Sequence, residues 1–166
     1  FGNGVAAHVS TAKPVSANLV QAVTAAADRV DERVTRGATY VCVPGPRLGT
    51  QAESYWLRQM GGDIVGMTNV PEVFLAREAQ IAYATLGLVT DYDCWLEDES
   101  LHVSAMGIFE LYGQTLAKAR LVIDHLLAHD LPEPEPAIRT ALSHAVLTPE
   151  ASLTADQRQW FDVLKR

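Results

Sequence analysis

The sequence predicts an α/β fold in which helices cover a central sheet. Short apolar runs, several rich in β-branched residues, alternate three times with segments in which apolar residues recur at helical spacing. These runs are apolar on both faces, as strands are when helices cover both sides of a sheet. A chain of 166 residues is long enough for one domain with a sizeable core. We expect residues 1–130 to be the C-terminal half of a domain, with residues 131–166 as a helical C-terminal tail packed on the same domain.

The first helix is expected between Ser16 and Arg36, with Ser16 as its N-cap and Gly37 as its stop. Apolar residues recur through this segment at helical spacing: Leu19, Val23, Ala26, Ala27, Val30 and Val34. Residues 39–43 (TYVCV) form a β-branched run that a Pro-Gly-Pro sequence stops. This run predicts a buried strand that enters a loop.

The second strand and the helices around it carry clear start signals. Thr50 and Glu53 form a T-x-x-E capping box, which predicts a helix that ends near Gly61. Residues 63–67 (DIVGM) predict the second strand. Pro71 is well placed as the first residue of the helix that follows, because its fixed φ suits that position.

The last part of the pattern contains one more strand and three helical segments. Residues 81–90 (IAYATLGLVT) predict a third apolar strand, and a long helix is expected from Ser104 onward. Residues 131–136 (LPEPEP) predict a stiff turn. Two shorter helices are expected after it, over residues 137–146 and 154–164.

Composition limits the classes of partner. The net charge is −7 and no run of basic residues occurs, which argues against nucleic-acid binding. No apolar stretch reaches the roughly 20 residues that cross a bilayer, so we expect no membrane association. Cys42 and Cys94 lie far apart without CxxC spacing, which favours buried thiols in a reducing compartment, the cytoplasm. The chain begins with Phe1 and reads like the middle of a domain, so we expect a fragment, a processed chain or one half of a split protein.

A turn between a strand and a helix could bind an anion. Residues 66–72 (GMTNVPE) leave the second strand, offer the Thr68 hydroxyl and enter a helix N-terminus, where backbone N–H groups suit an anion such as phosphate. Arg47, in the loop after the first strand, could meet an anion or could be structural. His125 and His129 share a helix face, but no third ligand is evident, so we expect no metal.

Two carboxylates follow the third predicted strand. In an extended chain, Asp91 and Asp93 project the same way while Tyr92 points opposite. Two like charges so close together favour protonation of one of them. Because ligands sit at the carboxyl ends of strands in α/β sheets, this pair could share a crevice with residues 66–72. The pattern is compatible with a small-molecule site and with an ordinary surface rim.

Three sequence blocks also carry a family resemblance. GPRLGTQAES (45–54), GMTNVPEVFLAREA (66–79) and TDYDCW (90–95) resemble the C-terminal half of methylthioadenosine phosphorylases, in the trimeric branch of the purine nucleoside phosphorylase family. GVAAHVSTAKPV (4–15) is similar to the segment that precedes them, and the likeness runs from about Val5 to Val122. It implies the C-terminal part of a three-layer fold, with a central mixed sheet flanked by helices.

The resemblance implies phosphorolysis of a purine nucleoside, most specifically of 5′-methylthioadenosine, to adenine and 5-methylthioribose 1-phosphate. Inorganic phosphate attacks the ribose C1′, and the purine leaves through an oxocarbenium-like transition state. Asp91 would then face purine N7 and the 6-amino group and protonate the leaving base. Asp93 would be the neighbouring carboxylate that orients the amino end of the purine.

Further positions carry over with the same resemblance. Met67 would lie along the ribose, and Thr68 would supply a phosphate-binding hydroxyl. His8 would reach into the neighbouring subunit's site near the 5′-methylthio group, which implies a homotrimer. Ala105 and Ile108 would lie beside the 5′ group. No cofactor is expected, because inorganic phosphate is the co-substrate.

The sequence departs from the family in two respects. After GPR, a purine-stacking Phe and then a Ser are usual, but this chain has Leu48 and Gly49. Loss of a stacking ring could weaken base binding by about 1–3 kcal/mol. The family's chains are also considerably longer, and their N-terminal half, with a Gly-rich phosphate loop, is expected upstream or as a separate chain. A non-catalytic nucleoside-binding or assembly subunit, and a phosphorylase for another purine nucleoside, therefore remain alternatives.

Overall fold

The computed structural model describes residues 4–98 and 105–165. Its contacts divide the chain into two compact units. Unit 1 comprises Phe1–Gln21, Pro71–Thr85 and Pro132–Arg166, and unit 2 comprises Ala22–Val70 and Leu86–Leu131. The predicted division into a domain over residues 1–130 and a tail over 131–166 stays a prediction.

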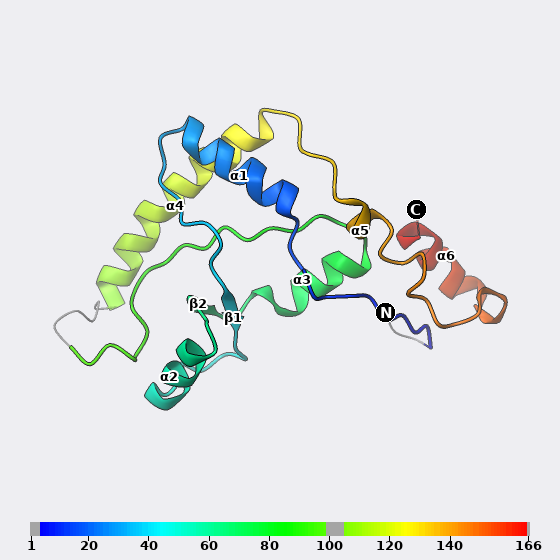
Figure 1. The fold of residues 1–166 in the computed structure, drawn as a ribbon, viewed down its shortest axis with the longest axis horizontal. Coiled ribbons are helices and arrows are strands. Elements are labelled where there is room, and N and C mark those ends of the chain that lie inside the picture. The colour runs from blue at the N-terminus through cyan, green and yellow to red at the C-terminus, as the bar shows by residue number, and fades with distance from the viewer. Residues whose placement is uncertain (1–3, 99–104, 166) are drawn as a thin grey trace. The chain divides into compact units, whose positions relative to one another are not determined.

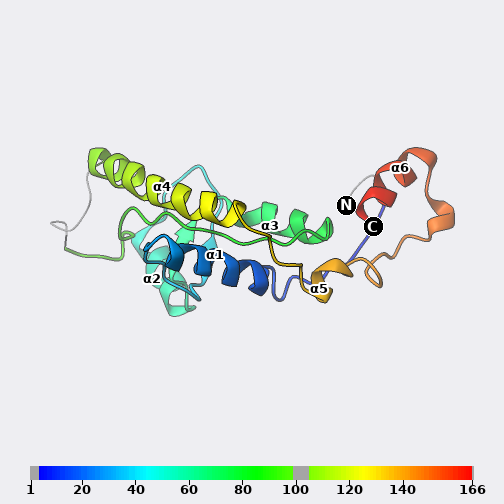
Figure 2. The ribbon, with the colours of Figure 1, turned by 90° about the horizontal axis from the view of Figure 1, so that it is seen from above.

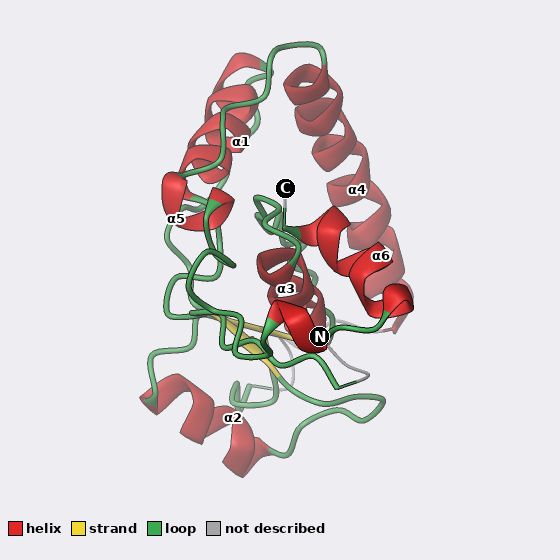
Figure 3. Cartoon of the chain, turned by 90° about the vertical axis from the view of Figure 1, so that its right-hand side faces the viewer, coloured by secondary structure: helices red, strands yellow, loops and turns green. Residues whose placement is uncertain are grey.

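Unit 2 contains a small parallel sheet. Strands β1 (Tyr40–Cys42) and β2 (Ile64–Gly66) pair in parallel, with Tyr40 opposite Ile64 and Cys42 opposite Gly66. Helix α2 (Gln51–Gln59) lies between them in sequence, as the crossover that parallel strands require. Figure 3 shows how short these strands are beside the helices. Both strands and the helix between them are confirmed, but the prediction that the strands are buried is wrong: the residues of β1 are half-buried and Val65 of β2 is 43% exposed.

The ends of α2 follow the sequence signals. The Thr50 hydroxyl accepts a hydrogen bond from the Glu53 N–H (3.2 Å), and the Glu53 carboxylate accepts one from the Thr50 N–H (2.7 Å). Gly61 adopts a φ of +85° directly after the C-cap Met60, a left-handed conformation that suits glycine. The capping box and the helix end near Gly61 are therefore confirmed.

A core cluster of unit 2 lies where two helices meet, α1 (Ala17–Arg29) and α4 (Ala105–Leu127), which cross in the view of Figure 1 and are both seen lengthwise in Figure 2. Ala26 and Ala27 of α1 pack with Val122 of α4 in a buried cluster. The prediction that the first helix extends to Arg36 is wrong. Asp31 adopts a φ of +57°, which ends the helical path, although Val34 still packs against the same cluster.

Unit 1 has its own core around α6 (Ala155–Leu164), in which Val5, Leu153 and Phe161 are buried together. The N-terminal segment is bridged to the C-terminal part of the chain by antiparallel pairing of Ala7 with Val146. A short 3₁₀ helix, η2 (Glu150–Ser152), precedes α6.

Two other helices of the pattern differ in detail. Helix α3 (Asn69–Glu78) contains a non-helical Val70, so its regular part begins at Pro71, as predicted. Helix α5 (Pro136–Arg139) is shorter than the predicted helix over 137–146. The Leu142 N–H donates to the Gln80 side chain (3.2 Å), and this bond replaces the helical one.

The prediction of a third strand over residues 81–90 is wrong for the part of the chain that the structure describes. This segment has no regular secondary structure, although Gly87 lies close to the Ile64 side chain of β2, and the described sheet contains only β1 and β2. Its apolar composition met the requirements of a buried strand, but a strand also needs a partner. Among the described helices, none is long and apolar enough to span a membrane.

Candidate active site

The carboxyl ends of β1 and β2 present Met67 and Thr68 in unit 2. The turn after β1 is tied to β2 by the Val43 N–H, which donates to the Gly66 carbonyl (2.9 Å). A Cβ on Gly45 would lie 2.9 Å from the Met67 sulfur, so the glycine lets Met67 pack against this turn. A Cβ on Gly66 would overlap the Tyr40 hydroxyl.

Two side chains of β1 hold the turn that contains Thr68. The Tyr40 Oη lies 3.4 Å from the Thr68 Oγ1 and accepts a hydrogen bond from the Thr68 N–H (3.5 Å). The Cys42 Sγ accepts one from the Val70 N–H (3.3 Å). The sequence suggested that backbone N–H groups of this turn bind an anion, but the N–H groups of Thr68 and Val70 donate to side chains of β1 instead. Thr68 itself is exposed.

Asp93 and Asp91 differ in how they are held. The buried Ser54 hydroxyl donates to Asp93 Oδ2 (2.6 Å), and the Cys94 N–H donates to Asp93 Oδ1 (2.9 Å). Asp91 is exposed, and its Oδ1 accepts from the Thr90 hydroxyl (2.7 Å). Within the described residues, Asp91 Oδ2 has no hydrogen-bond partner, so it is the carboxylate oxygen available to a ligand.

Helix α2 makes two further contacts with residues 93–97, here called the acidic segment. The Tyr55 hydroxyl donates to Glu97 (2.9 Å), and this bond raises the pKa of Tyr55. The Arg58 guanidinium lies 3.5 Å from the centroid of the Trp95 ring, a cation–π contact. Together with the Ser54 bond, these contacts hold residues 93–97 along one helix.

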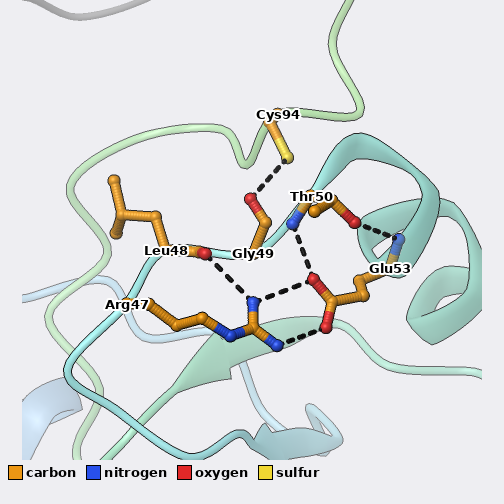
Figure 4. A network of polar contacts seen from close by, with 6 residues as sticks. All are labelled: Arg47, Leu48, Gly49, Thr50, Glu53 and Cys94. Carbon is orange, nitrogen blue, oxygen red and sulfur yellow. Dashed lines mark hydrogen bonds and ion pairs between the residues drawn. The ribbon is translucent and has the colours of Figure 1, made fainter.

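The loop that carries Leu48 and Gly49 is held by an ion pair (Figure 4). Arg47 donates to both Glu53 oxygens, at 2.9 and 2.5 Å, and to the Leu48 carbonyl at 3.1 Å. The hydrogen bond from Arg47, followed by those from Thr50, lowers the pKa of Glu53 to about 2. Of the two interpretations of Arg47, the structure supports the structural one.

The same loop meets the acidic segment through Cys94 (Figure 4). The Cys94 Sγ donates to the Gly49 carbonyl at 3.8 Å, next to the Asp93 that Ser54 holds. Burial, and then the charge of Asp93, raise the pKa of the Cys94 thiol. The Leu48 side chain is 86% exposed. Gly49 is therefore in contact with the segment that carries the acidic pair, at Cys94, 45 positions further along the chain.

No described contact joins Met67 or Thr68 to the acidic pair, because Met67 packs against Gly45 and Thr68 contacts Tyr40, so the crevice predicted to be shared by these residues stays a prediction. Three further predicted site residues are not joined to either group by any described contact. Ala105 begins α4, and Ile108 lies half-buried in its first turn. His8 belongs to unit 1, where its N–H donates to the Ala145 carbonyl (2.8 Å). Their roles stay predictions. The described residues contain no group of three or more side chains that could hold a metal ion.

Ser54 and Tyr40 are site residues that the sequence reasoning missed. Ser54 is a polar residue on the face of α2 that also carries the half-buried Leu57, three positions on, and a buried hydroxyl needs a partner. Tyr40 and Cys42 alternate in β1, so both side chains project to one face of the strand. Spacing could have indicated these faces, but it could not have identified the partners.

Comparison with known families now identifies the class of protein. The sequence model of the phosphorylase superfamily matches residues 1–128. The chain therefore belongs to the phosphorylase superfamily, and its fold is α/β.

Within this superfamily, the chain is similar to S-methyl-5′-thioadenosine phosphorylases. The chain is 40% identical to the S-methyl-5′-thioadenosine phosphorylase of Geobacter sulfurreducens, over 99% of this chain and 57% of that protein. It is 43% identical to the enzyme of that name from Rhodospirillum rubrum, over 89% of this chain and 51% of that one. The chain thus spans little more than half the length of these relatives.

Solved structures of methylthioadenosine phosphorylases are also similar to this chain. A methylthioadenosine phosphorylase from an Antarctic soil metagenomic library matches with a TM-score of 0.81 and 39% identity, over 99% of this chain and 58% of that one. The methylthioadenosine phosphorylase of Schistosoma mansoni, solved in complex with adenine, matches with a TM-score of 0.76 and 28% identity, over 86% of this chain and 57% of that one.

Proposed function

We propose that this chain is the C-terminal part of a methylthioadenosine phosphorylase. The enzyme transfers the 5-methylthioribosyl group of 5′-methylthioadenosine to inorganic phosphate and releases adenine. The names of the relatives support this substrate. The observation that carries the proposal is the Cys94–Gly49 contact beside the Ser54–Asp93 bond, because it joins the loop expected to face the base to the segment whose carboxylates are expected to bind and protonate it.

Asp91 and Asp93 have different roles at the purine base. A phosphate oxygen bonds to C1′ while the C1′–N9 bond breaks, and the bonding electrons leave with the purine. Protonated Asp91 donates its proton to N7 and so neutralises the developing charge. Its free Oδ2 supports this role, whereas both oxygens of Asp93 are occupied by protein donors, which suits a fixed acceptor for the 6-amino group.

The other half of the reaction needs groups at the end of β2 and beyond this chain. The Met67 N–H contacts the ribose hydroxyls, and the exposed Thr68 hydroxyl binds phosphate beside Tyr40. An N-terminal half supplies the remaining phosphate contacts. In the cytoplasm the enzyme assembles as a homotrimer, in which His8 reaches the 5′ group of a neighbouring site. It needs no cofactor.

The proposal is tested by adenine release from 5′-methylthioadenosine with and without inorganic phosphate. The chain is assayed alone and fused to the N-terminal half of the Geobacter sulfurreducens relative. We expect phosphate-dependent release from the fusion, with formation of 5-methylthioribose 1-phosphate. Purine binding without turnover in the fusion would instead identify a non-catalytic nucleoside-binding subunit.

A phosphorylase for another purine nucleoside is a second candidate. Leu48 is 86% exposed and Gly49 has no side chain, so the loop offers neither a stacking ring nor a hydroxyl to an adenine base. Assays of adenosine, 5′-methylthioadenosine and inosine with the same fusion separate the two candidates. A higher kcat/KM for inosine would favour the second.

A further inference from the structure

Ser54 stands out among the residues of α2. Its relative exposure is 3%, and it is the buried residue of this helix. A buried hydroxyl without a partner costs about 1–3 kcal/mol, so a serine at such a position depends on its hydrogen bond. That bond goes to Asp93 Oδ2 at 2.6 Å, 39 positions away in sequence.

The position of Ser54 is fixed by contacts that do not involve Asp93. It directly follows Glu53, which closes the capping box with Thr50 and accepts two hydrogen bonds from Arg47. The first turn of α2 is thus tied to the loop that carries Leu48 and Gly49. The Ser54 hydroxyl lies on this turn, so its hydrogen bond fixes Asp93 relative to the same loop.

The two donors to Asp93 have different origins. The Cys94 N–H belongs to the neighbouring residue, so it moves with the segment and cannot fix it to the rest of unit 2. The Ser54 hydroxyl comes from α2. The other α2 contacts act further along, through Glu97 and Trp95. Among the described contacts, only Ser54 fixes the Asp93 carboxylate itself to another element.

We propose that Ser54 is a positioning residue that orients Asp93 and, through it, places Asp91 against the purine. This inference rests on the proposed phosphorylase function for its catalytic consequence. Ser54 does not touch substrate. It sets the direction of the carboxylate that does, and a small displacement of that group is expected to reduce turnover.

The kinetic test compares three variants in the fusion described above. Ser54→Ala removes the hydroxyl, Ser54→Thr retains it, and Tyr55→Phe removes a different hydrogen bond between α2 and the same segment. We expect Ser54→Ala to lower kcat about tenfold or more while KM for phosphate stays unchanged. Ser54→Thr should restore most of kcat, and Tyr55→Phe should stay within about twofold. Equal kcat values for Ser54→Ala and the unaltered protein would overturn the proposal.

A second readout does not depend on catalysis and uses the 166-residue chain itself. Alkylation of Cys94 by iodoacetamide is followed by mass spectrometry of its peptide, which separates it from Cys42. Because the Ser54 hydroxyl also lowers the pKa of the Cys94 thiol, the limiting rate at high pH, where the thiol is ionised in every variant, is compared. Loss of the Ser54 bond should free the segment and speed this limiting rate about fivefold, whereas Tyr55→Phe should not. If the fusion is inactive with every nucleoside, the proposed function fails while this result still stands. An unchanged alkylation rate in Ser54→Ala would overturn the positioning role.

Discussion

Gly66 is the residue on which the turn after β2 depends most directly. It is the last residue of β2, and its missing side chain leaves room for the Tyr40 hydroxyl, which reaches the N–H and hydroxyl of Thr68. The proposed phosphate hydroxyl is therefore positioned through a residue that itself contributes no functional group.

Gly66→Ala is expected to destabilise unit 2, because the added Cβ overlaps the Tyr40 side chain. Overpacking of this kind costs about 1–3 kcal/mol. Urea unfolding measures the effect. Gly113→Ala is the matched control: no atom lies within 4 Å of its added Cβ, and it lies inside α4, so it should stabilise the chain by about 0.5–1 kcal/mol. Equal midpoints for the two variants would contradict this role of Gly66.

Leu48 is the second residue on which function depends. Its side chain is 86% exposed in the loop that Arg47 holds, so a larger ring can be accommodated there. We expect Leu48→Phe to lower KM for a purine nucleoside, corresponding to about 1–3 kcal/mol of added stacking. Steady-state kinetics of the fusion measure this change. Leu48→Met is the control for side-chain size, and an equal KM in both variants would contradict a stacking position.

At the scale of elements, α2 organises the site. Its capping box fixes the loop before it, and three of its side chains, those of Ser54, Tyr55 and Arg58, contact residues 93–97. The stability of this helix should therefore depend on the ionisation of Glu53.

Glu53→Gln tests that dependence across pH. The folded pKa of Glu53 is about 2, below its ordinary value of 4.5, so ionised Glu53 favours the folded state above pH 4.5. That contribution is lost as the pH falls from 4.5 through 2. Urea midpoints should differ between the unaltered chain and Glu53→Gln at neutral pH and converge toward pH 2. A constant difference over this range would contradict the account. Glu133→Gln, in another exposed ion pair, is the control.

The same elements show what the sequence could and could not predict. Local signals located α2 and the start of regular helix at Pro71, because a capping box and a proline act within one turn. The prediction of a third strand over residues 81–90 was wrong, because a strand needs a hydrogen-bonded partner strand and apolar composition does not show whether one is present. The first helix was overextended because Val34 is apolar for packing in a non-helical segment. The sequence indicated Asp91 and Asp93 as candidate site residues, which stay a prediction, whereas the hydrogen bond from Ser54 to Asp93 could be identified only from the fold.

At the scale of the whole molecule, the predicted site residues are distributed over both units. Asp91, Asp93, Met67 and Thr68 belong to unit 2, whereas His8 belongs to unit 1. The chain also spans 57% of the Geobacter sulfurreducens relative. Complete activity is accordingly expected only when the N-terminal half of the enzyme is supplied.

The proposed role of Asp91 as the acid for the leaving base is tested by turnover of 5′-methylthioadenosine in Asp91→Asn, in the fusion with that N-terminal half. Adenine release is measured with and without phosphate, beside the unaltered fusion, and circular dichroism confirms that both are folded. We expect phosphate-dependent release by the unaltered fusion and a loss of about 10² or more in kcat for Asp91→Asn. A folded Asp91→Asn variant that releases adenine at the unaltered rate would contradict this role.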